Sequence, residues 1–237
     1  MTNPVVHFEV VGKDGAKLRD FYAGVFGWSF NVMEPMDYGI VDNGGAGAGG
    51  GIGTAPAPMS TFYIAVADPQ AALNAVEANG GKTTMPVMEI PGVVTLAQFS
   101  DPDGNIVGLV KDDGTQPPPS AAPPAANPVT WFEVQGKDGG RSREFYSKVF
   151  SWKYEVAPDM DYGMVQNEDQ GIGGGVGGGD TAHAIFYVEV PDLQATLDKI
   201  ESGGGKTVMP VTDMGMVTIA QFTDPEGNPV GLFKSNQ

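Results

Sequence analysis

The chain of 237 residues lacks cysteine and has only two histidines. Without cysteine there are no disulfides, thiolate nucleophiles or cysteine-ligated metal sites. Basic residues are also scarce, because 13 Lys and Arg stand against 29 Asp and Glu and give a formal net charge of −16. Nucleic-acid surfaces and anionic membranes recruit proteins through basic patches, so this balance argues against nucleic acid and membrane as partners.

Long apolar segments are missing as well. No run of residues is long and apolar enough to cross a bilayer, and the N-terminus lacks the basic and then apolar segment of a secretion signal. We therefore expect a cytoplasmic protein. Hydrophobic residues make up 41% of the chain, which is ordinary for a globular protein and supplies a core for each domain.

The chain does contain a long internal repeat. Residues 21–28 (FYAGVFGW) return as residues 145–152 (FYSKVFSW), and residues 101–105 (DPDGN) return as residues 224–228 (DPEGN). The spacing far exceeds the roughly 20–50 residues of a solenoid repeat, so two copies of a whole domain are predicted.

The two copies are predicted to be residues 1–111 and 129–237, joined by a linker at residues 112–128. The linker is rich in Pro and Ala and has no core-forming side chains, which predicts an extended, semi-stiff segment. It is long enough for the copies to dock as a pseudo-dimer within one chain. An exchange of halves between two chains fits the sequence as well, so a monomer and a swapped dimer both stay open.

The first copy begins with an alternating strand. Val6, Phe8 and Val10 point to one side, and His7 and Glu9 point to the other, which predicts one apolar and one polar face. Periodicity and turn residues along the copy give the order strand, helix and three strands, twice. The helices are expected at 14–26 and 69–79, and the strands at 5–11, 28–33, 38–41, 48–52, 61–67, 83–88, 93–99 and 106–110.

Each copy is therefore predicted to be an α+β domain whose helices cover one face of a curved mixed sheet. The uncovered face is a candidate ligand cup, and a face closed by docking of the domains is the alternative. Glycine-rich strands at 47–53 and 171–176 are expected to leave room there for a bulky ligand, or to let the backbone approach the ligand. The residues expected on this face are His7, Glu9, Tyr63, Gly108 and Val110 in the first copy, and Trp131, Glu133, Tyr187, Glu189 and Gly231 in the second.

Two glutamates are candidates for catalysis. Glu9 and Glu133 hold equivalent positions on the polar side of the first strand of each copy. A carboxylate in a partly apolar cup can act as a general base, and a role as a simple hydrogen-bond acceptor is the alternative. His183 is expected as a strand-entry residue near solvent, and the alternative is that the strand starts early and places His183 on the same face as Tyr187, four residues later.

Other polar and aromatic side chains are candidates for ligand binding. Tyrosines and glutamines recur at equivalent positions, where they are suited to hydrogen-bond a ligand, with packing as the alternative. The indole of Trp131 favours stacking on a flat organic molecule. The ligand-binding candidates are His7, Glu9, Tyr63, Gln98, Trp131, Glu133, Tyr187 and Gln221.

The helix and hairpin motifs, within a duplicated strand-helix-three-strand plan, resemble the vicinal oxygen chelate superfamily. This family includes glyoxalase I, extradiol dioxygenases and bleomycin-resistance proteins. The resemblance covers both copies and implies tandem domains, each a pair of βαβββ units that form a cup. Enzymes of the family hold a divalent metal there, commonly with two His and a Glu. The matching positions lie on three strands of each copy: the first strand, the strand that opens the second strand-helix-three-strand unit (the restart strand) and the last strand. They are occupied by His7 and Trp131, by Tyr63 and Tyr187, and by Gly108 and Gly231, so only His7 is a residue that the family uses as a ligand.

Three functions follow as hypotheses. The leading one is a glyoxalase/bleomycin-resistance-like protein that binds a small organic molecule in the cup, with no family-type metal site and no cofactor. The second is a divergent lyase, isomerase or dioxygenase with a divalent metal, centred on His7 and Glu9. The third is a protein-interaction module with filled cups. The sequence leaves open whether the chain is an enzyme and which molecule it binds.

Overall fold

The computed structural model describes most of the chain. The described residues are 3–42, 44–112, 127–156, 158, 160–166 and 171–236. The predicted linker at 112–128 lies outside them except at its ends. Within these residues, no helix has both the length and the apolar character needed to span a membrane.

The strands of the described residues form two mixed sheets of eight, one from each copy, which confirms the predicted fold class. The chain also divides into two compact units that cut across the copies. Each unit combines a module from each copy, where a module is one strand-helix-three-strand segment. Unit 1 consists of Met1–Val6, Thr61–Pro117 and Phe132–Ala184, and unit 2 consists of His7–Ser60, Pro118–Trp131 and Ile185–Gln237.

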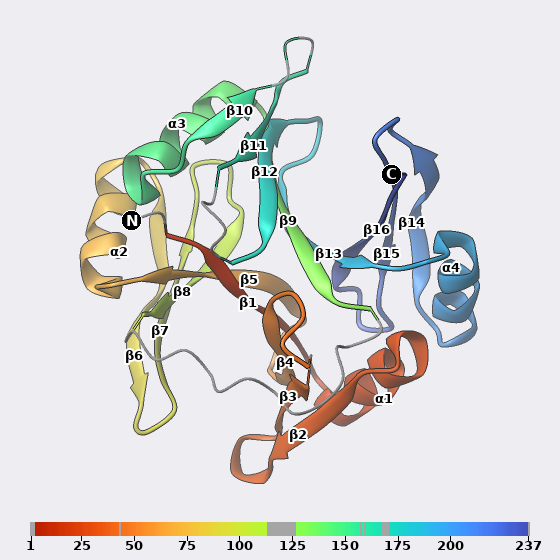
Figure 1. Ribbon diagram of the computed structural model, residues 1–237. Coiled ribbons are helices and arrows are strands. Elements are labelled where there is room, and N and C mark those ends of the chain that lie inside the picture. Colours follow the sequence, from red (N-terminus) through yellow and green to blue (C-terminus); the bar gives the residue numbers. More distant parts are fainter. Residues whose placement is uncertain are drawn as a thin grey trace. The chain divides into compact units, whose positions relative to one another are not determined.

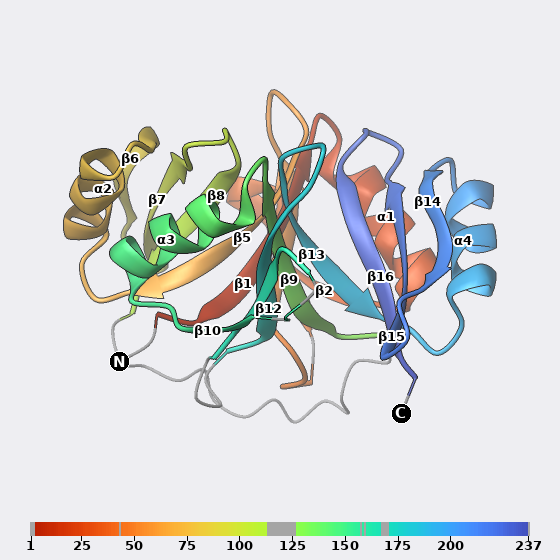
Figure 2. The ribbon, with the colours of Figure 1, turned by 90° about the horizontal axis from the view of Figure 1, so that it is seen from above.

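Unit 1 contains most of the second module of the first copy and of the first module of the second copy. The first of these modules comprises β5 (Met59–Val66), α2 (Pro69–Ala78), β6 (Lys82–Ile90), β7 (Val94–Ser100) and β8 (Ile106–Lys111). The other comprises β9 (Val129–Gly136), α3 (Gly139–Phe150), β10 (Tyr154–Val156), β11 (Tyr162–Val165) and β12 (Gly173–Gly178). Helices α2 and α3 lie side by side, as Figure 1 and Figure 2 show.

Unit 2 contains most of the first module of the first copy and of the last module of the second copy. The first of these comprises β1 (Val5–Gly12), α1 (Gly15–Phe26), β2 (Ser29–Met33), the short helix η1 (Glu34–Met36), β3 (Tyr38–Asp42) and β4 (Gly49–Thr54). The other comprises β13 (His183–Glu189), α4 (Leu193–Ser202), β14 (Lys206–Asp213), β15 (Val217–Thr223) and β16 (Pro229–Ser235). Helices α1 and α4 lie side by side in Figure 1.

The first and last strands of a module pair in parallel, because the helix between them carries the chain back to the starting edge. This register places Glu9 of β1 opposite Gly51 of β4. Tyr63 of β5 lies opposite Gly108 of β8 in the same way. These pairings decide which side chains share the polar face of each module.

Each of the four α-helices described begins after an aspartate whose side chain accepts a backbone N–H of the first turn. Such a cap satisfies a donor that has no partner within the helix. The four aspartates are Asp14, Asp68, Asp138 and Asp192.

The apolar faces predicted from strand alternation form the cores of the units. Phe8 and Val10 of β1 are buried, which confirms the predicted orientation of this strand. In unit 2 the rings of Phe8 and Phe186 lie 4.8 Å apart between centroids. In unit 1 the rings of Phe62 and Phe132 lie 5.0 Å apart. Each core therefore joins aromatic residues from both copies.

The two repeated motifs meet in unit 1. Tyr146, in the helix motif of the second copy, donates a hydrogen bond over 3.2 Å to Asp101 Oδ2, in the hairpin motif of the first copy. Asn105 Nδ2 of the same hairpin donates to the carbonyl oxygen of Gln135 over 2.9 Å. Tyr146 and Asp101 are both buried. The helix and first-strand segment of one copy are thus hydrogen-bonded to the hairpin of the other copy, and we call this the helix–hairpin contact.

Unit 2 contains the same helix–hairpin contact with the two copies exchanged. Tyr22 donates to Asp224 Oδ2 over 3.2 Å, and Asn228 Nδ2 donates to the carbonyl oxygen of Val11 over 3.2 Å. The helix motif and the hairpin motif therefore recur together because each completes a contact with the other copy.

Candidate ligand-binding faces

Unit 1 carries a tyrosine–glutamine pair on the polar face of β5, β7 and β8. Gln98 Nε2 donates to the hydroxyl of Tyr63 over 3.1 Å. The ring of Tyr63 lies against Gly108, where an added Cβ would come within 2.3 Å of Tyr63 Cδ1. The last-strand position that the resemblance assigns to a metal-binding glutamate is thus filled by the Tyr63 ring.

Unit 2 has the same arrangement in the second copy. Gln221 Nε2 donates to the hydroxyl of Tyr187 over 3.1 Å. An added Cβ at Gly231 would come within 2.2 Å of Tyr187 Cδ1. The pair is therefore a feature of both copies, as is the glycine that makes room for its ring.

His7 lies in unit 2 and meets Tyr38 of β3, with 3.2 Å between His7 Nε2 and the tyrosine hydroxyl. Burial lowers the pKa of His7 from 6.5 to about 4, so its imidazole is neutral at pH 7. The ring of Tyr38 covers Gly51 and Gly53, where an added Cβ would lie 2.2 and 2.6 Å from ring atoms. The expectation that these glycines leave room for a bulky ligand is wrong, because the chain's own tyrosine fills the space.

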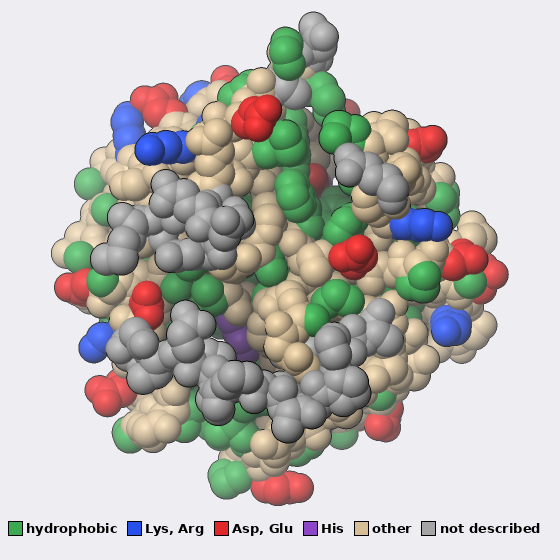
Figure 3. All heavy atoms as spheres, viewed as in Figure 1, with side chains coloured by type: hydrophobic (Ala, Val, Ile, Leu, Met, Phe, Trp, Pro, Cys, Tyr) green, Lys and Arg blue, Asp and Glu red, His purple; other side chains and the backbone are tan. Residues whose placement is uncertain are grey.

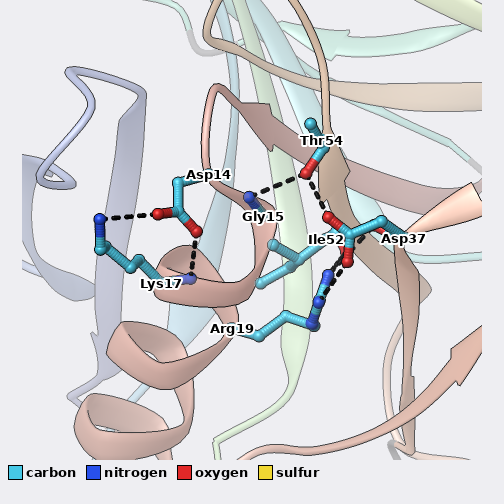
Figure 4. A network of polar contacts seen from close by, with 7 residues as sticks. All are labelled: Asp14, Gly15, Lys17, Arg19, Asp37, Ile52 and Thr54. Atoms are coloured by element: carbon cyan, nitrogen blue, oxygen red, sulfur yellow. Dashed lines mark hydrogen bonds and ion pairs between the residues drawn. The ribbon is translucent and has the colours of Figure 1, made fainter. Parts of the chain in front are cut away.

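A polar network fixes the turn that precedes Tyr38 (Figure 4). Asp37 has φ 46°, a left-handed conformation that is uncommon outside glycine. The guanidinium of Arg19 pairs with the Asp37 carboxylate at 2.6 Å, and Thr54 Oγ1 donates to the same carboxylate at 2.5 Å. The hydrogen bond from Thr54 and then that from Arg19 lower the pKa of Asp37. The network holds Tyr38 in place against His7.

The second copy, in unit 1, keeps the arginine–aspartate pair of this network. Gly178 stands in place of Thr54, and the backbone N–H of Gly139 donates to Asp161 over 2.8 Å instead. Arg143 pairs with the Asp161 carboxylate at 2.9 Å, and the ring of Tyr162 fills the space over the equivalent glycines. Sequence reasoning did not select these residues as functional. The signal that points to them is the motif MDYG, which occurs at residues 36–39 and 160–163.

Unit 1 also brings His183 to the candidate catalytic residue Glu133. His183 Nε2 lies 3.1 Å from Glu133 Oε1, and Gln135 Nε2 donates to the same oxygen over 3.1 Å. His183 begins β13 as predicted, and 23% of its side chain is exposed, against 12% for Glu133. The histidine is thus a partly exposed member of a polar cluster at the start of the strand.

The two remaining candidates lie on the first strands. Glu9 is half-buried on β1 in unit 2, opposite Gly51. Trp131 is half-buried on β9, also in unit 2. Their roles in binding or catalysis stay predictions.

The residues at the family ligand positions do not fit a divalent metal. Transition-metal sites use three or more histidine or carboxylate ligands at about 2.0–2.2 Å. The tyrosine hydroxyls at the restart-strand positions are hydrogen-bonded to glutamines, and the glycines at the last-strand positions are covered by rings. Across the parts of the chain that the structure describes, no three His, Asp or Glu side chains are arranged to hold a metal ion.

A groove of about 910 Å³ lies in unit 2 between α1 and α4. Leu18, Phe21 and Val25 line it, and none of the predicted site residues does. Gly24 of α1 also borders the groove, and a Cβ added there would meet no atom within 4 Å. The groove belongs to the helices and not to the polar faces of the sheets.

Acidic side chains dominate the charged surface. On the face shown in Figure 3, red Asp and Glu side chains are scattered among fewer blue Lys and Arg side chains. This distribution follows from the 29 acidic and 13 basic residues of the chain.

Comparison with known proteins points to one family. The sequence pattern described as the Glyoxalase/Bleomycin resistance protein/Dioxygenase superfamily matches residues 5–109 and, a second time, residues 129–232. The two matches fall on the two copies and omit the linker.

Individual relatives match either one copy or the whole chain. CFP32 of Mycobacterium tuberculosis is 31% identical over 118 residues, so the match spans about half of this chain and half of CFP32, 45% of each. The anthracycline biosynthesis protein DauV of Streptomyces sp. (strain C5) is 26% identical over 252 residues, covering 93% of this chain and 89% of DauV. The Mn(II)-bound glyoxalase from Novosphingobium aromaticivorans shares the fold, with a TM-score of 0.68 at 16% identity over 100% of this chain and 83% of that chain.

Proposed function

Because the chain belongs to the glyoxalase/bleomycin resistance protein/dioxygenase superfamily, we propose that it binds a flat aromatic small molecule on the polar face of its sheets, without a family-type metal ion. The observation that carries the proposal is the tyrosine–glutamine pair found in each unit. Gln98 donates to Tyr63, and Gln221 donates to Tyr187, each over 3.1 Å. Hydrogen-bonding groups thus stand where the resemblance implies metal ligands.

The pairs have the chemistry of an organic-ligand site. A tyrosine hydroxyl both donates and accepts hydrogen bonds, which is the chemistry that a carbonyl or hydroxyl group of an organic ligand requires. Packing against glycine holds the rings of Tyr63 and Tyr187 in place, and both residues are buried. A hydroxyl that is already held in position loses little entropy on binding. A few such polar groups orient a ligand, and apolar walls supply most of the affinity.

Two observations favour an aromatic ligand. The indole of Trp131 occupies a first-strand position and offers a stacking surface. DauV, which matches this chain over 93% of its length, is named for anthracycline biosynthesis. Hydroxylated anthraquinones are flat aromatic compounds of related chemistry and are suitable probes.

The test uses the full chain after EDTA treatment and dialysis, with 1,8-dihydroxyanthraquinone in a calorimetric titration. We expect binding without added metal. Tyr63→Phe and Tyr187→Phe should each weaken it about three- to tenfold, the value of one hydrogen bond. Met216→Ala, at a position that is 70% exposed, is the control and should bind as the wild type does. Binding that appears only after Fe, Mn, Ni or Zn is added overturns the proposal and favours the metal-dependent alternative at His7 and Glu9.

A further inference from the structure

The groove between α1 and α4 in unit 2 shares no lining residue with the candidate ligand-binding faces. Its volume of about 910 Å³ falls within the range of about 300–1,000 Å³ that small-molecule sites occupy. Leu18, Phe21 and Val25 form its floor, and they belong to the apolar stripe by which α1 is buried in the unit. The groove therefore has the size and the apolar wall of a site for an organic molecule.

Acidic side chains outnumber basic ones around this groove. The acidic residues are Asp14, Asp20, Asp198 and Glu226, and the basic residues are Lys17 and Lys199, so two negative charges are in excess. Lys17 Nζ lies 2.7 Å from Asp14 Oδ2 (Figure 4), which compensates the charge at the start of α1. The remaining excess, together with the acidic net charge of the chain, favours a cation over an anion as the occupant.

The two copies differ in the helical turn that borders the groove. In α3 of the second copy, Lys148 Nζ lies 2.7 Å from the carboxylate of Glu144, four residues earlier. The equivalent residues of α1 are Asp20 and Gly24, so the carboxylate is kept and the lysine is absent.

Packing does not explain the glycine in α1. A Cβ added at Gly24 would meet no atom within 4 Å beyond the helix backbone, so the position has room for a side chain. Glycine also weakens the interior of a helix relative to residues that carry a Cβ. Its effect is to leave open the space beside Asp20, which a lysine side chain at this position would occupy.

We propose that the groove binds a small organic cation, an amine with an apolar body, whose ammonium group pairs with Asp20 in place of the missing lysine. The apolar body lies over Phe21 and Val25, and Asp198 on the facing helix adds a second negative charge. Exposed ion pairs contribute little free energy. The apolar contact therefore supplies most of the affinity, and the charge supplies the selectivity. This site is independent of the proposed function, because its residues lie on the helices and not on the polar faces of the sheets.

The test compares 2-naphthylmethylamine with 2-naphthalenemethanol, which keeps the ring system and carries a neutral hydroxyl in place of the ammonium group. The full chain is titrated with each compound at low salt, and binding is followed in ¹H–¹⁵N correlation spectra. We expect the amine to bind about three- to tenfold more tightly than the alcohol and to shift the backbone signals of α1 and α4. The preference should decrease at about 0.3 M salt, because salt screens exposed charges.

Three variants assign the preference to the groove. Asp20→Asn should reduce it to about twofold or less, with the affinity for the alcohol unchanged. Glu144→Gln is the matched control, because it removes the equivalent carboxylate of the second copy and changes the net charge by the same amount. It should keep the preference of the wild type. Gly24→Lys supplies the missing cation from the chain itself, so it should weaken binding of the amine, with a Tm no lower than that of the wild type.

The outcomes decide between this site and its alternatives. Equal affinity of the wild type for the two compounds, or binding of neither, overturns the proposal. A preference that Asp20→Asn leaves unchanged, or that Glu144→Gln reduces equally, overturns it as well. Displacement of the amine by 1,8-dihydroxyanthraquinone would place the amine at the site of the proposed function and not in the groove.

A protein partner is the other possible occupant of a groove between helices. An amphipathic peptide of Lys and Leu, titrated in the same way, tests it. If the peptide shifts the signals of α1 and α4 and the amine does not, the small-molecule proposal is overturned in favour of a protein partner. Unchanged circular dichroism of each variant excludes loss of folding as the cause of weaker binding.

Discussion

The buried contact between Tyr146 and Asp101 predicts that Tyr146→Phe lowers the free energy of unfolding by about 1.5–2 kcal/mol. A hydrogen bond to a charged group contributes about 1.5–3 kcal/mol, and a distance of 3.2 Å indicates the lower end of this range. The carboxylate keeps three other donors, the backbone N–H groups of Asp103 and Asn105 and the side-chain amide of Asn105. The variant therefore leaves no buried charge without hydrogen bonds, which keeps the loss moderate.

The pH dependence separates the lost hydrogen bond from lost packing. Burial raises the pKa of Asp101, and the hydrogen bonds that it accepts, including that from Tyr146, lower it in part. The Phe variant should raise this pKa further. A raised pKa means that the folded state binds the proton more tightly, so the carboxyl stabilises the fold most at low pH and less as the pH rises through the folded pKa. That decrease is larger in the variant, so the stability that Tyr146→Phe loses relative to the wild type should be smaller at about pH 3.5 than at pH 7.

The assay is urea and thermal unfolding of the wild type and Tyr146→Phe at pH 7 and at about pH 3.5. For a chain of this size a loss of 1 kcal/mol corresponds to a decrease in Tm of about 2–4 °C. Tyr22→Phe removes the equivalent bond to Asp224 in unit 2 and should give a similar loss. A loss below about 0.5 kcal/mol, or a loss of the same size at both pH values, would refute the role assigned to the hydroxyl.

Three further predictions follow from single contacts. Gly108→Ala brings a Cβ within 2.3 Å of Tyr63, so it should destabilise the fold by about 1–3 kcal/mol in thermal unfolding, and a variant as stable as the wild type would contradict the packing. Because burial lowers the pKa of His7 to about 4, the stability that it contributes is complete above pH 6.5 and is lost as the pH falls towards 4. One pKa unit corresponds to about 1.4 kcal/mol, so the wild type should lose up to about 3 kcal/mol relative to His7→Gln over this range, and parallel urea-unfolding stabilities would disprove it. Asp192→Ala removes the cap that accepts the N–H of Ala195 at 2.9 Å and should cost about 1 kcal/mol, which Asp192→Asn should largely restore.

Local patterns were sufficient to predict the elements of the fold. Strand alternation predicted a strand at 5–11, which is β1 (Val5–Gly12), and the apolar stripe predicted a helix at 14–26, which is α1 (Gly15–Phe26). Both signals depend on residues within a few positions of one another, so the sequence contains them completely. The same alternation placed Tyr63 and Gly108 on one face, as their contact confirms.

These local patterns could not predict which side chains from distant segments contact one another. The pair of Glu133 and His183 joins residues 50 positions apart, and periodicity does not specify which side chains meet at that distance. Glycine content in a strand shows that side chains are missing, but not that Tyr38 fills the space. The sequence also does not show which modules combine in a compact unit, because two copies with the same motifs can form each contact within a copy or between copies.

The helix–hairpin contact has a consequence for a protein that contains only one copy. One copy on its own, if it kept this arrangement, would have to find the partner of its buried tyrosine and aspartate in a second molecule. In the duplicated chain both partners are supplied within one molecule, and the two halves need not be identical. A substitution in one half is not repeated in the other, and the halves do differ, with His7 in one and His183 in the other.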